Sequence, residues 1–291
     1  MTVLEVIQKS ADFLAKKGVD SPRLQIELLL ARALKIPRLN LYLDFERSLS
    51  KAEAEVVRQM VKRRGRREPL QHIVGSTSFC GLEMHVTPAV LVPRPETELL
   101  AERAWLFLNG RQSGEPDPMS VLDFGTGSGC LAIAIAVQAP TARVRASDIS
   151  AAAIEVASQN AAAHRVSDKI EFVQGDGFSA LPAGSLFDLI VSNPPYIPTG
   201  EIETLQPEVR DHDPRLALDG GEDGLGFYRR FAVEARPFLR PAGRLMVEIG
   251  DGQEAAIREL FARQEWCVES VQSDDTGRPR ILEARAADWA R

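Results

Sequence analysis

The sequence contains little cysteine and little histidine, which limits the chemistry open to it. Three cysteines and four histidines occur among 291 residues, and they are scattered along the chain rather than grouped. Zinc sites and disulfide frameworks need closely spaced cysteines or histidines, so neither is expected and no metal is predicted. An odd number of widely separated cysteines is typical of a reducing compartment, so we expect a cytoplasmic protein.

Long apolar runs and a positive net charge are also absent. The longest apolar run, Cys130 to Val137, is too short to cross a bilayer, and the first residues lack the basic segment and apolar core of a signal peptide. A formal net charge of −6 argues against a protein that coats nucleic acid. One basic run, residues 62–67, either ends a helix or contacts RNA or an acidic partner.

The first part of the chain carries helix signals. Residues 1–70 contain two capping boxes and a serine–proline helix start, at Thr2 with Glu5, at Ser50 with Glu53, and at Ser21-Pro22. We therefore predict a small N-terminal helical domain. Residues 71–93 follow as a β-hairpin linker, because the segments 72–79 and 82–86 flank Cys80-Gly81.

Residues 94–291 alternate between strand and helix patterns. The expected strands are 121–124, 143–147, 170–173, 187–192, 244–249, 266–271 and 281–284, and the expected helices are 129–138, 151–164, 225–238 and 253–263. Strands that alternate with crossover helices predict an α/β fold, here a Rossmann-like, doubly wound, mostly parallel seven-stranded sheet. The last two strands are expected to form an antiparallel edge, and residues 110–118 a polar surface loop.

The most informative motif is Asn193-Pro194-Pro195-Tyr196, which follows the apolar strand 187–192. Two prolines cannot extend a central strand, so they form a rigid exit whose carbonyls lack ladder partners. An asparagine amide and such a carbonyl can grip both hydrogens of a planar NH2 group. The motif alone could be a plain turn, but with the glycine-rich loop it indicates methylation of an amide or amino nitrogen.

A glycine-rich loop, Gly125-Thr126-Gly127-Ser128-Gly129, lies where the first strand of the sheet turns into a helix. Ligands of open α/β sheets bind at such carboxyl ends, and the first N–H groups of a helix favour an anionic group. The spacing differs from the dinucleotide-binding fingerprint, and no lysine follows to form a phosphate-binding loop. A structural turn is the alternative for the loop taken alone.

Two acidic residues extend the pattern along the sheet. Asp148 ends the second strand, where it can accept hydrogen bonds from ribose hydroxyls, and Asp176-Gly177-Phe178 follows the third strand, where adenine can be held. Core packing is the alternative for Phe178. Together with the loop, these residues predict S-adenosylmethionine as the cofactor.

These motifs, together with Pro93-Arg94-Pro95-Glu96-Thr97-Glu98 and Gly220-Gly221-Glu222-Asp223-Gly224-Leu225, resemble the release factor glutamine methyltransferases, the HemK/PrmC family. The resemblance spans essentially the whole chain. It implies transfer of a methyl group from S-adenosylmethionine to the side-chain amide nitrogen, N5, of the Gly-Gly-Gln glutamine in class 1 peptide-chain release factors. It also implies a protein partner that the helical domain recognises. We expect a monomer.

The resemblance also assigns residues by position. It gives cofactor contacts to Gly125, Thr126, Gly127, Ser128, Gly129, Asp148, Gly177 and Asn193, substrate contacts to Asn193, Pro194, Pro195 and Tyr196, and catalytic roles to Asn193, Pro194 and Tyr196. Asn193 Oδ1 and the Pro194 carbonyl would each accept one amide N–H. Family members can carry an aromatic where this chain has Gly177, so the ring beside adenine is either Phe178 or missing.

Three other functions fit part of the pattern. A methyltransferase acting on adenine N6 or guanine N2 of nucleic acid would also hold a planar NH2 group, but the sequence shows no basic track for a strand. A non-catalytic module could bind S-adenosylmethionine only as a ligand, although the intact Asn193-Pro194-Pro195-Tyr196 argues against it. A dehydrogenase that uses NAD is disfavoured by the glycine spacing.

Overall fold

The computed structural model describes residues 1–110 and 118–287, and these residues divide into two compact units. Unit 1 comprises Met1–Ser76 together with Leu205–His212, and unit 2 comprises Thr77–Thr204 and Asp213–Arg291. No helix among the described residues is long and apolar enough to span a membrane. Most of the predicted loop 110–118 lies outside the described residues.

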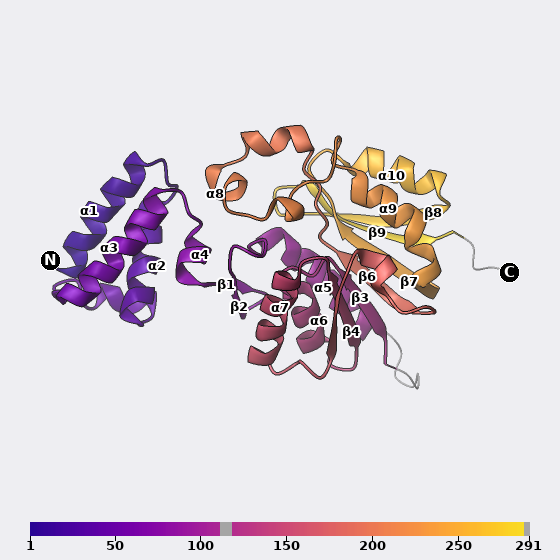
Figure 1. Ribbon diagram of the computed structural model, residues 1–291, viewed down its shortest axis with the longest axis horizontal. Coiled ribbons are helices and arrows are strands. Elements are labelled where there is room, and N and C mark those ends of the chain that lie inside the picture. Colours follow the sequence, from indigo (N-terminus) through magenta and orange to yellow (C-terminus); the bar gives the residue numbers. More distant parts are fainter. Residues whose placement is uncertain (111–117, 288–291) are drawn as a thin grey trace. The chain divides into compact units, whose positions relative to one another are not determined.

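Unit 1 is helical (Figure 1). Its helices are α1 (Val3–Lys16), α2 (Pro22–Leu34), the short 3-10 helix η1 (Arg38–Tyr42), α3 (Lys51–Gly65), α4 (Leu70–Val74) and α8 (Pro207–Arg210). Both predicted capping boxes are present, at the starts of α1 and α3. Helix α2 begins at Pro22 as expected, but Ser21 has a left-handed backbone and makes no side-chain cap bond. An apolar core between α1, α2 and α3 holds unit 1 together.

The segment 205–212 joins unit 1 although it follows Asn193-Pro194-Pro195-Tyr196 in the sequence. The Glu208 carboxylate accepts a hydrogen bond from Arg64 at 2.7 Å and two from Arg67 at 2.6 Å. The side chain of Arg64 is 4% exposed, so this ion pair lies largely out of water. The basic run 62–67 therefore begins in the last turn of α3, as a helix end, and part of its charge is neutralised within unit 1.

Unit 2 begins with the hairpin of β1 (Ser76–Phe79) and β2 (Leu82–His85). Cys80 and Gly81 form its turn with φ values of 50° and 75°, the left-handed pair that tight hairpins require. The expectation of a strand over residues 72–74 is wrong. These residues belong to α4, which Pro69 precedes and which ends at Gly75 in a left-handed conformation.

The main sheet has seven strands, in the order β5-β4-β3-β6-β7-β9-β8. Their bounds are β3 (Ser120–Phe124), β4 (Arg143–Asp148), β5 (Ile170–Gln174), β6 (Phe187–Ser192), β7 (Leu239–Glu248), β8 (Trp266–Ser273) and β9 (Pro279–Ala286). The first five strands in this order, β5-β4-β3-β6-β7, pair in parallel. Strand β9 pairs antiparallel with both β7 and β8. The predicted Rossmann-like, mostly parallel sheet with an antiparallel edge is confirmed.

Helices cover both faces of this sheet (Figure 1). On one face lie α5 (Pro95–Asn109), α6 (Cys130–Gln138) and α7 (Ala151–Ala163), and on the other α9 (Gly226–Glu234) and α10 (Glu254–Arg263). Successive residues of a strand point to opposite faces, so Val121 and Leu189 join one core while Leu122 and Ile190 join the other. Both cores consist mostly of apolar side chains, which pack the helices against the sheet.

The strand order reverses beside β3, because the chain builds β4 and β5 on one side of it and β6 and β7 on the other. The loops after β3 and β6 diverge at such a point and leave a crevice. Short 3-10 helices follow two strands there: η2 (Gly177–Ala180) after β5, and η3 (Thr199–Thr204) after β6. A third, η4 (Arg215–Ala217), lies further along the chain, and η5 (Arg236–Phe238) precedes β7.

Candidate active site

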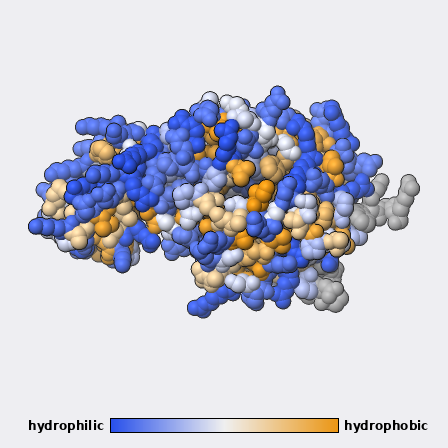
Figure 2. Space-filling model, in the orientation of Figure 1, coloured by the Kyte–Doolittle hydropathy of each residue, from blue (hydrophilic) through white to orange (hydrophobic). Residues whose placement is uncertain are grey.

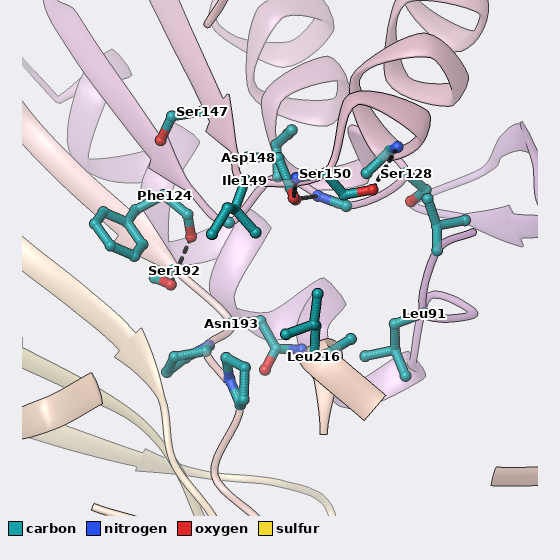
Figure 3. Close-up of a pocket in the computed structure, with 18 of the residues that line it drawn as sticks. Leu91, Phe124, Ser128, Ser147, Asp148, Ile149, Ser150, Ser192, Asn193 and Leu216 are labelled. Carbon is teal, nitrogen blue, oxygen red and sulfur yellow. Dashed lines mark hydrogen bonds between the residues drawn. The ribbon is translucent and has the colours of Figure 1, made fainter. Parts of the chain in front are cut away.

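A pocket opens in unit 2 at the carboxyl ends of β3, β4, β5 and β6 (Figure 3). Of the residues predicted for the site, those that line it are Gly125, Thr126, Gly127, Ser128, Asp148, Gly177, Asn193, Pro194 and Pro195. Gly129 and Tyr196 do not line it. Figure 3 shows Asn193 and Leu216 across the pocket from Asp148 and Ser150. The structure thus brings the glycine loop and the asparagine–proline motif, far apart in sequence, to one cavity.

The glycine loop presents bare backbone to the pocket. Gly125 and Gly127 have φ values of 75° and 55°, and a Cβ built on either would meet no heavy atom within 4 Å. A ligand can therefore approach this backbone closely. Gly129 has a different surrounding, because a Cβ there would lie 3.0 Å from Ala157 Cβ. Gly129 accordingly serves the packing of α6 against α7, where it is the N-cap of α6.

A buried carboxylate shapes this loop from beneath. Asp123 is fully buried, and its Oδ2 accepts hydrogen bonds from the Thr126 hydroxyl at 2.6 Å and from the Ala132 N–H at 3.1 Å. Burial raises the pKa of Asp123 to about 7, although the hydrogen bonds from Thr126 and Ala132 oppose the shift. The carboxyl group ties the turn to the first turn of α6, so the glycines keep one conformation.

Asp148, the last residue of β4, stands beside the loop. One of its oxygens accepts a bond from the Gly127 N–H and the other from the Ser150 N–H, both at 2.9 Å (Figure 3). Each carboxylate oxygen has a second lone pair, so the side chain is held firmly and can still accept a hydrogen bond from a ligand hydroxyl. Ile149 and Leu216 also line the pocket and are 56% and 71% exposed. Figure 2 shows hydrophobic residues interspersed with hydrophilic ones on one face of the molecule.

The end of the pocket near β5 is formed by small residues and by a ring from another strand. Gly175, Asp176 and Gly177 line it, together with Phe124 and Phe227. A Cβ on Gly177 would lie 2.4 Å from the Phe124 ring, so Phe124 occupies the space that a side chain at position 177 would need. Phe178 is 3% exposed and stacks on Phe238 in the core, so it does not line the pocket. The aromatic surface of the pocket thus comes from Phe124 on β3 and Phe227 on α9.

The asparagine–proline motif leaves β6 as an all-trans segment. Its start is braced by the Ser192 hydroxyl, which donates to the Phe124 carbonyl at 2.7 Å (Figure 3). The Asn193 side-chain NH2 donates to Thr97 Oγ1 at 2.9 Å. In the described part of the chain, no group donates to Asn193 Oδ1 or to the Pro194 carbonyl. Two acceptors at the pocket wall are therefore free to receive N–H groups.

Tyr196 anchors the far end of the motif. Its carbonyl accepts a bond from Gln253 Nε2 at 2.9 Å, and its hydroxyl lies 3.4 Å from Glu248 Oε1. Burial raises the pKa of Tyr196 well above its usual value, and the charge of Glu248 adds to this. The ring packs against the core on the side of α9 and α10. Both ends of the two prolines are consequently fixed.

Two further groups belong to the site, although the sequence did not indicate their roles. Thr97 lines the pocket from the first turn of α5, and Glu248 ends β7 behind it. They are 2% and 1% exposed. Thr97 belongs to the proline-containing segment that precedes and starts α5. Leu91 and Arg94 of this segment also line the pocket, whereas Glu96 does not line it. In the sequence, Glu248 could have been noticed as a single glutamate at the end of an otherwise apolar strand segment.

An ion pair between half-buried Arg94 and buried Asp213 lies beside the pocket wall. Arg94 donates to Asp213 Oδ2 at 2.7 Å, and the Asp213 side chain is 1% exposed. Burial raises the pKa of Asp213 to about 6, and the charge of Arg94 acts against that shift. The pair joins the segment before α5 to the segment that supplies Pro214 and Leu216 to the wall. Within residues 1–110 and 118–287, no cluster of acidic, histidine or cysteine side chains is arranged to hold a metal ion.

Both parts of the chain are similar to known protein families. Residues 5–75 match the family described as PrmC N-terminal domain, and residues 111–209 match the Methyltransferase small domain. A release factor glutamine methyltransferase from Geobacter sulfurreducens is 44% identical over 98% of this chain and 96% of its own. One from Chlorobaculum tepidum is 46% identical over 89% of both chains. A solved methyltransferase from Pyrococcus furiosus shares the fold, with a TM-score of 0.53 and 18% identity over 78% of this chain and 99% of its own.

Proposed function

The chain belongs to the family of release factor glutamine methyltransferases, and from this premise we propose which of its residues perform the reaction. The enzyme transfers a methyl group from S-adenosylmethionine to the side-chain amide nitrogen, N5, of the Gly-Gly-Gln glutamine in class 1 release factors. The observation that carries the residue assignment is the pair of free acceptors, Asn193 Oδ1 and the Pro194 carbonyl, on the wall of the glycine-lined pocket.

The pocket suits the cofactor. S-adenosylmethionine, when bound, supplies a methyl group already activated on a positively charged sulfur. Most N–H groups of the glycine loop already donate within the protein, so the carboxylate would lie at the start of α6, just after Gly129. Asp148 would accept from the ribose hydroxyls, and adenine would lie near Gly177, against the Phe124 ring that Gly177 accommodates. The bare backbone of Gly125 and Gly127 supports this assignment, because any side chain there would enter the same space.

The glutamine amide would lie against the asparagine–proline motif. Asn193 Oδ1 and the Pro194 carbonyl would each accept one N–H of its NH2 group, which fixes the nitrogen in line with the methyl carbon. Pro195 and Tyr196 would keep this wall rigid, since the Tyr196 carbonyl is tied to Gln253 and its hydroxyl faces Glu248. Asn193 lines the same pocket as the glycine loop and would also contact the cofactor there.

These contacts compensate for the low nucleophilicity of the amide nitrogen. An amide nitrogen is a poor nucleophile because its lone pair is delocalised into the carbonyl group. Positive charge develops on this nitrogen during transfer, and two oxygen dipoles aimed at its hydrogens stabilise that charge. A proton leaves the nitrogen after transfer, and no strong base is needed at that stage. The residues therefore contribute position and electrostatic stabilisation.

The experiment that tests the proposal compares substrates and one variant. Wild-type enzyme and Asn193→Ala are incubated with labelled cofactor and a class 1 release factor, or with DNA or RNA, and the products are analysed by mass spectrometry. We expect a single methyl group on the glutamine, and a turnover in Asn193→Ala that is lower by about 10²-fold or more, the cost of losing one charge-stabilising group. Cofactor affinity, measured by calorimetry, should remain near wild type. Near-normal turnover in the variant would refute the role of Asn193.

The remaining partner assignments are part of the same proposal. We propose that unit 1 recognises the release factor outside its glutamine loop, as remote contacts commonly supply specificity. A stable nucleic-acid complex does not form, in this view, because Arg63 pairs with Glu68 while Arg64 and Arg67 pair with Glu208. All three cysteines are free, which supports a cytoplasmic location. The monomeric state stays a prediction, which light scattering would measure.

A further inference from the structure

A buried chain of hydrogen bonds extends from Asn193 into the protein. The Asn193 NH2 group donates to Thr97 Oγ1 at 2.9 Å, and the Thr97 hydroxyl donates to Glu248 Oε2 at 2.6 Å. The other carboxylate oxygen of Glu248 faces the Tyr196 hydroxyl at 3.4 Å. Thr97 lies on α5, Glu248 ends β7, and Asn193 and Tyr196 follow β6, so three parts of the fold meet at this network.

The directions of these bonds are fixed by chemistry. An ionised carboxylate only accepts hydrogen bonds, so the single hydroxyl hydrogen of Thr97 must point to Glu248. Thr97 Oγ1 then offers Asn193 only a lone pair, which only the NH2 end of the amide can fill. Asn193 Oδ1 is thereby turned away from Thr97. Reversing the amide would place an acceptor against an acceptor and would present NH2 to the substrate NH2.

We propose that Thr97 and Glu248 are positioning residues for the methyl transfer, because together they hold the Asn193 amide with its oxygen toward the substrate nitrogen. This inference rests on the proposed function and adds to it the groups that enforce the orientation of Asn193. Neither residue would touch the reacting atoms through its hydrogen-bonding group. Thr97 acts on the rate through Asn193, and Glu248 acts through Thr97 and through the Tyr196 hydroxyl that it faces.

The charge on Glu248 makes this arrangement dependent on pH. Burial raises the pKa of Glu248 to about 7, and the nearby charge of Glu96 adds to this shift. The Thr97 hydrogen bond, the charge of Arg280 and the Tyr196 hydroxyl oppose it. A protonated Glu248 can donate to Thr97 Oγ1. The Thr97 hydrogen is then released to donate to Asn193 Oδ1, and the amide can reverse. The rate should therefore fall as the pH drops through this range.

The first test is a cycle of variants in the full-length enzyme with release factor and cofactor at saturating concentrations. Thr97→Val keeps the shape of the side chain and removes its hydroxyl, while Thr97→Ser restores the hydroxyl. In the native background, Thr97→Val should lower kcat by about 10- to 100-fold, the worth of one hydrogen bond to a charged group, and leave KM for the release factor near wild type. Thr97→Ser should retain most of kcat.

The same substitution is then made in the Asn193→Ala background. If Thr97 acts through Asn193, Thr97→Val should have almost no further effect on this slower rate. The expected change is less than about twofold, which is the usual scatter of such mutant cycles. An equal loss in both backgrounds would show a structural role and would overturn the inference. Cofactor affinity by calorimetry and thermal unfolding of each variant confirm that the pocket is intact.

A second variant tests the inference even if Thr97→Val does not fold. Glu248→Gln keeps the size of the side chain and cannot ionise. Wild-type kcat should rise with pH with an apparent pKa near 7, as Glu248 loses its proton, and Glu248→Gln should lose this rise. An identical pH profile in the two proteins would overturn the proposal.

Failure of this inference differs from failure of the proposed function. If the wild-type enzyme does not methylate the glutamine, the proposed function fails, and if Asn193→Ala is as active as wild type, the proposed role of Asn193 fails. If Asn193→Ala is slow but Thr97→Val is as active as wild type, only the positioning role fails.

Discussion

Gly127→Ala, which adds a single methyl group, should weaken cofactor binding while the protein still folds. A Cβ at this position would meet no heavy atom within 4 Å, because the position faces the pocket. The φ of 55° is left-handed, and an alanine there costs about 1–2 kcal/mol in stability. The new methyl group overlaps any ligand packed on this backbone. Overpacking costs about 1–3 kcal/mol, so the cofactor Kd should rise roughly 5- to 150-fold.

Gly277→Ala provides the matched control. Gly277 lies in the turn between β8 and β9, has a φ of 82° and also leaves its Cβ in open space. It carries the same backbone strain and does not line the pocket. Calorimetry should give Gly277→Ala a wild-type Kd for S-adenosylmethionine, with a loss of thermal stability similar to that of Gly127→Ala. If both variants bind the cofactor equally well, the loop does not hold it.

Three other substitutions test the ion pairs and the ribose contact. Asp148→Asn should weaken cofactor binding in calorimetry, and an unchanged affinity would count against the ribose contact. Glu208→Gln leaves the buried Arg64 with no carboxylate, so it should lower the free energy of unfolding by about 1–3 kcal/mol in urea titrations. Arg94→Met should destabilise more at pH 8 than at pH 5, since Asp213 without its partner takes up a proton as the pH falls, and an equal loss at both pH values would contradict this.

The sheet could be predicted because its signals are local. Strands buried on both faces form continuous apolar runs, and the predicted strand 187–192 coincides with β6. The glycine loop and the asparagine–proline motif follow two such strands, so their meeting at one edge follows from a parallel sheet. Residues 72–74 were predicted wrongly because a five-residue helix and a short strand give the same apolar pattern.

The contacts that could not be predicted join residues far apart in the sequence. Thr97 and Glu248 are separated by 151 positions, and Arg64 and Glu208 by 144. No period or spacing connects such pairs, since each depends on how whole elements pack. The sequence likewise did not indicate that Phe124 would fill the space beside Gly177. Tertiary packing decides these features.

The central claim is that Asn193 and Pro194 hold the glutamine NH2 group beside the activated methyl group. The most direct measurement is a crystal structure of the enzyme with S-adenosylhomocysteine and a release factor. We expect the glutamine nitrogen to lie about 2.7–3.2 Å from both Asn193 Oδ1 and the Pro194 carbonyl oxygen. A glutamine nitrogen bound elsewhere, or an Asn193 whose NH2 group faces the substrate, would contradict it.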